Sequence, residues 1–196
     1  VGITSSGLGV QSAFTLAPYL TAMGAYIRDP APYLKAARPH DVMVMVGHGS
    51  PWRDPAQMRF RNGFWFYKSG VDAIRWWYYT EMGDPYLTID SAGGWESNLI
   101  YPTPEGTPNP TIDYECCREG VDDVRYIYTL EKRIAEAERS PSRAVRVAVE
   151  RARAVLEGIM SRVFSDYHLY KGKLAVWSPE AFDAYRRRIA DAIVEI

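Results

Sequence analysis

The apolar segment at residues 41–46, Asp-Val-Met-Val-Met-Val, most constrains what this chain can fold into. Apolar side chains at successive positions face both sides of a β-strand, which is typical of a strand buried in a parallel sheet. Residues 58–68 then show the aromatic spacing of a packed helix, and Ser69-Gly70 would end that helix. Residues 71–79 are the next strand-like segment. This order of strand, helix and strand predicts a βαβ unit and a parallel sheet.

The rest of the chain divides into a loop-rich part and a helical part. A further strand is expected within residues 23–27, and a short helix at residues 33–37. Residues 81–110 are rich in Gly, Pro and Asn, which favours a long functional loop. Later helices are expected over residues 111–137, after Ser140-Pro141 and after Ser178-Pro179.

Composition excludes several classes of protein. A formal net charge of -1 does not favour binding to nucleic acid, which usually requires a basic surface. No apolar segment approaches the ~20 residues that a membrane-spanning helix needs. The two cysteines, Cys116 and Cys117, are adjacent and cannot form an ordinary disulfide. No Cys/His spacing predicts a metal site, and no motif predicts a cofactor. The chain starts at Val1 without a signal segment, which leaves the compartment open.

The strand at residues 71–79 carries the first candidate binding residues. Alternation places Arg75, Trp77 and Tyr79 on one face, and the acidic Glu81 follows the strand. Aromatic rings stack on the CH faces of sugars while carboxylates hold sugar hydroxyls, so this pattern favours carbohydrate binding. The alternative is that these aromatic side chains are plain core, packed between sheet and helix.

Two loops carry the remaining candidates. His48 and Trp52 directly follow the strand at 41–46, where a histidine is either a general acid/base or hydroxyl ligand, or a loop residue bonded to backbone. Trp95 and Glu96 lie in a Gly-rich segment, either as substrate contacts or as a loop held by a buried indole.

Charged residues on the expected helices favour structural roles. Asp122 and Asp123 follow Arg118 within about one helical turn, which indicates a salt bridge. The arginines at 151 and 153 and those at 186–188 are expected to lie on solvated helix faces.

Several motifs taken together resemble the end of a glycoside hydrolase (β/α)8 barrel. The family is glycoside hydrolase family 123, which resembles β-N-acetylgalactosaminidases, with its associated uncharacterised C-terminal domain. The resemblance covers about residues 40–135, with Ala73 in place of an expected Gly and residues 93–98 in place of a Gly-Asp-Gly. The motifs are Arg61-x-x-x-Trp65, Lys68-Ser69-Gly70-Val71-Asp72-Ala73, Trp77-x-Tyr79, Leu99-Ile100-Tyr101-Pro102 and Glu115-x-x-Arg118-Glu119-Gly120-Val121-Asp122-Asp123.

This resemblance implies the C-terminal part of a TIM-type barrel. Residues 1–137 would be its last strands and helices, and residues 138–196 a helical extension. The family's catalytic Asp-Glu pair, which orients the substrate's acetamido group and protonates the leaving oxygen, has no match in this chain. The main acids would then lie on an N-terminal barrel portion or a partner chain, with Glu81 or Glu96 as weaker candidates.

Two functions therefore remain open from the sequence. The first is a portion of a glycosidase that hydrolyses a glycosidic bond with a carboxylate pair. The second is a non-catalytic carbohydrate-binding or structural module that kept the aromatic wall without the acids. A small enzyme of another α/β class is disfavoured, because the chain has neither a glycine-rich phosphate loop nor a nucleophile elbow.

Overall fold

A computed structural model describes residues 22–25, 30–36, 42–47, 55–76, 99–164 and 176–196. Helices predominate, and they lie beside a three-stranded parallel sheet of order β1–β2–β3. Its strands are β1 (Ala22–Ala25), β2 (Val42–Gly47) and β3 (Ala73–Trp76). Ala22 is opposite Val42, and Val44 is opposite Ala73. The predicted βαβ unit and parallel pairing are therefore confirmed.

The connections between the strands are helical, as predicted. Helix α2 (Ala31–Ala36) lies between β1 and β2 in the sequence. Between β2 and β3 lie α3 (Pro55–Phe60), the π-helical turn η2 (Arg61–Trp65) and α4 (Phe66–Ser69). Gly70 ends α4 with φ 72°, a left-handed conformation that suits glycine at a helix C-terminus.

The expected loop at residues 81–110 contains a hairpin at its end. Strands β4 (Ile100–Pro102) and β5 (Pro108–Pro110) pair antiparallel, and Gly106 takes φ 75° in the turn between them. Proline is disfavoured in most strands, so a composition rich in Pro predicted a loop here. The side chains of β5 are all exposed, and such an edge position tolerates proline. The part of this segment at residues 81–98 is outside the described residues.

Three long helices form the other side of the molecule. They are α5 (Ile112–Ala137), α6 (Arg143–Met160) and α7 (Pro179–Glu195). The hydroxyl groups of Thr111 and Ser178 accept N-cap hydrogen bonds from Tyr114 N and Ala181 N, as serine and threonine caps do. The helix expected after Ser140-Pro141 is α6, but the serine at its N-cap is Ser142, so Ser140-Pro141 does not itself form the helix start.

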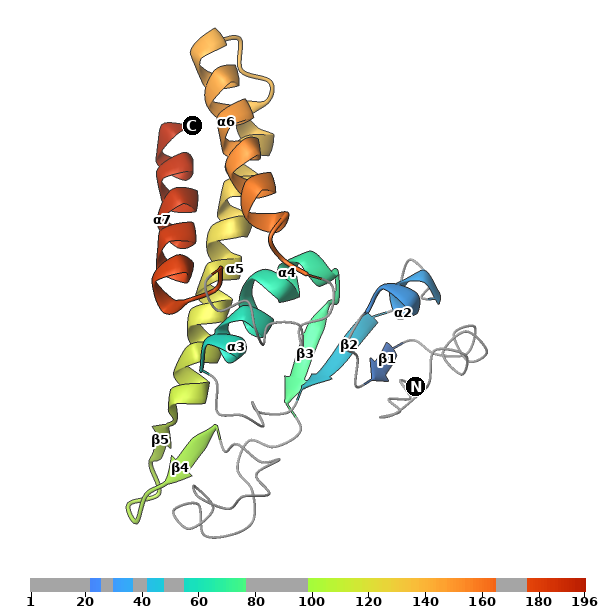
Figure 1. Ribbon diagram of the computed structural model, residues 1–196, viewed down its shortest axis with the longest axis vertical. Coiled ribbons are helices and arrows are strands. Elements are labelled where there is room, and N and C mark those ends of the chain that lie inside the picture. Colours follow the sequence, from blue (N-terminus) through green and yellow to red (C-terminus); the bar gives the residue numbers. More distant parts are fainter. Residues whose placement is uncertain (1–21, 26–29, 37–41, 48–54, 77–98, 165–175) are drawn as a thin grey trace.

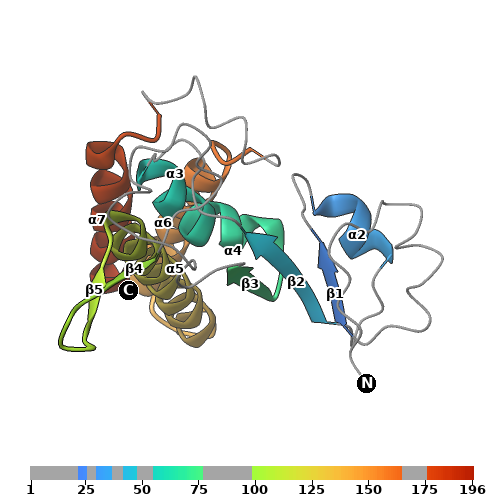
Figure 2. The same cartoon turned by 90° about the horizontal axis from the view of Figure 1, so that it is seen from below.

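One cluster of buried side chains joins these helices to the α3–α4 segment. Figures 1 and 2 show α3 and α4 between the sheet and the long helices. Trp177 packs edge-on against Phe60 at a ring-centroid distance of 4.7 Å and lies tilted against Phe64 at 5.2 Å. Side chains from both sides of position 137 belong to this cluster, among them Phe60, Phe64, Ile127, Phe182 and Ile189. The predicted helical extension therefore shares its core with the preceding residues.

Candidate functional site

The candidate residues follow two strands that end at the same edge of the sheet. Gly47, the last residue of β2, is the register partner of Trp76, the last residue of β3. Arg75 lies in β3 opposite Val46, one residue before that edge. Figure 1 shows both strands pointing toward the same end of the molecule. Parallel strands bring the segments that follow them to one edge, which is the usual position of sites in α/β folds.

The other candidates lie outside the described residues. Seven of them, four aromatic, two acidic and one histidine, belong to residues 48–54 and 77–98. They are His48, Trp52, Trp77, Tyr79, Glu81, Trp95 and Glu96. Their roles as binding or catalytic residues stay predictions.

The segment between β2 and β3 is held by contacts that the sequence motifs suggested only in part. Lys68 Nζ donates to the carbonyl oxygens of Met160 at 2.8 Å and Val163 at 2.6 Å, at the end of α6. A cation at this position compensates the unpaired carbonyls of a helix C-terminus. Trp65 is 1% exposed and is part of the core. Lys68 therefore attaches α4 to the end of α6, and Trp65 anchors the preceding turn in the core.

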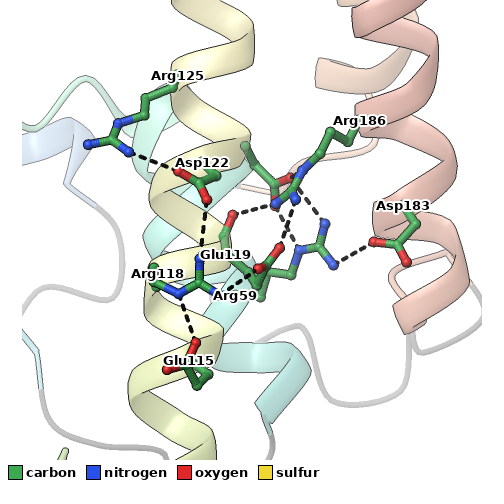
Figure 3. A network of polar contacts seen from close by, with 9 residues as sticks. Arg59, Glu115, Arg118, Glu119, Asp122, Arg125, Asp183 and Arg186 are labelled. Carbon is green, nitrogen blue, oxygen red and sulfur yellow. Dashed lines mark hydrogen bonds and ion pairs between the residues drawn. The ribbon is translucent and has the colours of Figure 1, made fainter. Parts of the chain in front are cut away.

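A buried charge network lies where α3, α5 and α7 meet (Figure 3). The Asp123 carboxylate is fully buried and accepts from Arg59 Nε at 2.8 Å, Arg59 Nη2 at 3.1 Å and Arg186 Nε at 2.6 Å. Arg59 also donates to Asp183, and Arg186 donates to the carboxylate of Glu119. Asp123 is thus bound by two guanidinium groups from two different helices.

Burial and charge act in opposite directions on these groups. Burial raises the pKa of the Asp123 carboxyl above its ordinary value, while the hydrogen bonds from Arg59 and Arg186 oppose that rise. Burial also disfavours the charged form of Arg59, yet its pKa is raised because Asp123 and Asp183 stabilise the cation. The Arg59 guanidinium further packs over the ring of Phe182 at 4.9 Å. The network is therefore a structural connection between three helices.

This network corrects two expectations from the sequence. Arg118 pairs with Asp122 at 3.7 Å and with Glu115 at 2.7 Å, which confirms the expected bridge for Asp122. Asp123 instead pairs with Arg59 and Arg186, so Arg186 is not on a solvated face. The helical spacing of Gly120, Asp123, Ile127 and Leu130 places Asp123 on the buried side of α5, and this signal was available in the sequence.

The two cysteines are free and lie next to this network. Asn62 Nδ2 donates to Cys117 Sγ at 3.4 Å. Burial raises the pKa of the Cys117 thiol to about 12, with Asp113 adding to the rise and Arg61 opposing it. A thiol protonated at neutral pH is a poor nucleophile and a poor metal ligand. Among the residues that the structure describes, no group of His, Cys, Asp and Glu is arranged to hold a metal ion.

Comparisons with models of protein families, with curated proteins and with solved structures find no match for this chain. The resemblance to glycoside hydrolase family 123 therefore stays an expectation from the sequence motifs. Within the described ranges, no helix combines the length and the apolar character needed to cross a membrane.

Proposed function

We propose that this chain is the C-terminal part of a (β/α)8 barrel glycoside hydrolase and contributes part of the wall of its sugar-binding site. The observation that carries this proposal is the pairing of Gly47 with Trp76 at the ends of two adjacent parallel strands. The segments that contain most of the candidate residues follow these two positions directly in the sequence. Barrel enzymes bind their substrates at this end of the strands.

The candidate residues divide into three roles. The aromatic side chains of Trp52, Trp77, Tyr79 and Trp95 stack on sugar rings. His48 and Arg75 hold sugar hydroxyls. Glu81 and Glu96 are the acidic candidates of this chain, and at least one member of the catalytic carboxylate pair lies outside it.

A non-catalytic carbohydrate-binding module is the second candidate function. The observation that favours it is the lack of a match in this chain to the family's adjacent Asp-Glu pair. A module of this kind would use the same aromatic residues for binding and would not hydrolyse the ligand.

Sugar binding tests both candidates. We would titrate the chain with a panel of N-acetylhexosamine and neutral hexose glycosides by isothermal titration calorimetry. Trp77→Ala should weaken binding about tenfold, because one stacking contact is worth about 1.4 kcal/mol. Tyr126→Ala removes an exposed aromatic side chain of α5 and should leave the affinity unchanged. Absence of binding to the whole panel would contradict both functions.

Hydrolysis separates the two candidates. The substrate would be p-nitrophenyl N-acetyl-β-galactosaminide, offered to the chain alone and to the polypeptide with any residues that precede Val1 in its reading frame. If the chain is part of a glycosidase, the longer protein should hydrolyse this substrate. Where Glu81 or Glu96 is the catalytic acid, its replacement by Gln should reduce the hydrolysis rate about 10²–10⁴-fold. Glu105→Gln, in the β4–β5 turn, is the matched control. Binding without turnover in both proteins would favour the binding module.

A further inference from the structure

We draw no further inference here: the strongest candidate, the outer face of α6 where Arg143, Val147, Arg151 and Ala154 line a shallow hollow, carries nothing, because its charged side chains are exposed to solvent and nothing in the described part of the chain shows what covers it.

Discussion

The inner and outer sides of α5 carry the same chemical pairs in very different surroundings. On the inner side, Asp123 is fully buried between Arg59 and Arg186. On the outer side, Arg118 and Arg125 pair with Asp122 in water, with guanidinium side chains that are 54% and 75% exposed. Neighbouring aspartates in one helix can therefore differ completely in their structural importance.

The difference follows from solvation. An exposed pair contributes about 0–1 kcal/mol, because water already solvates each partner well. A buried charge that loses its partners cannot recover water, so the loss costs about 3–5 kcal/mol. Arg59 and Arg186 come from different helices, so the inner pairs also fix how α3 and α7 lie on α5.

The largest expected effect is the loss of the inner carboxylate. Asp123→Ala leaves the buried Arg59 guanidinium with only the exposed Asp183, and should lower the free energy of unfolding by about 3–5 kcal/mol. Asp122→Ala is the matched control and should cost less than about 1 kcal/mol. Urea denaturation followed by circular dichroism measures both values. Similar losses in the two variants would remove the distinction between the two sides.

A smaller effect on stability is expected at Gly120, where α5 crosses the segment of α3 and η2. A Cβ atom on Gly120 would lie 2.7 Å from the Arg59 carbonyl oxygen and 2.9 Å from Gly63 N, both fixed backbone atoms. Gly120→Ala should therefore destabilise the protein by about 1–3 kcal/mol. Gly158 of α6 has open space around it, and Gly158→Ala should stabilise by about 0.5–1 kcal/mol through helix propensity. Thermal denaturation gives the opposite signs, and the same sign for both would contradict the close crossing.

A still smaller difference in stability is expected between substitutions of the serines that precede α6 and α7. Ser178 accepts a hydrogen bond from Ala181 N at 3.3 Å, whereas Ser142 makes no side-chain cap bond. Ser178→Ala should cost about 1 kcal/mol, and Ser142→Ala only a few tenths. Chemical denaturation at neutral pH compares the two, and an equal cost would show that the Ser178 cap bond contributes nothing.

The smallest effect on stability at neutral pH is expected for the thiol of Cys117, which lies beside the buried charge network of α5. The pKa of Cys117 is raised from 9.0 to about 12 in the folded state, so the folded protein holds its proton more tightly than the unfolded chain. The thiol therefore leaves stability unchanged below about pH 9, and stability should fall as the pH rises from about 9 toward 12. Cys117→Ala should flatten this fall more than Cys116→Ala does. Denaturation midpoints between pH 7 and pH 11 measure the slopes, and identical slopes would contradict the assignment.

Local signals predicted much of the fold. The apolar segment at 41–46 corresponds to β2, and the Ser178-Pro179 signal marks the start of α7. Both depend on neighbouring residues in the sequence, and such signals can be read directly. The hairpin of β4 and β5 was missed because its strands are three residues long and contain prolines.

Long-range pairs could not be predicted in the same way. Asp123 has a local arginine, Arg118, yet it binds Arg59 and Arg186, which are 64 and 63 residues away. Helical spacing from Phe182 and Ile189 places Arg186 rather than Arg187 beside the buried side of α7, but it does not identify the acidic partner. For the candidate site, the shared strand edge was predictable from the βαβ order, while the roles of Trp77, Glu81 and their neighbours stay predictions.

The single core that crosses position 137 also has a consequence for synthesis. Chains are made from the N-terminus, and segments fold as their partners become available. Phe60 and Phe64 pack against Trp177 and Phe182, more than 110 residues later in the chain. During translation these aromatic side chains remain without their final partners until residues 177–182 have left the ribosome. A nascent chain stalled before residue 177 would therefore present them to chaperones.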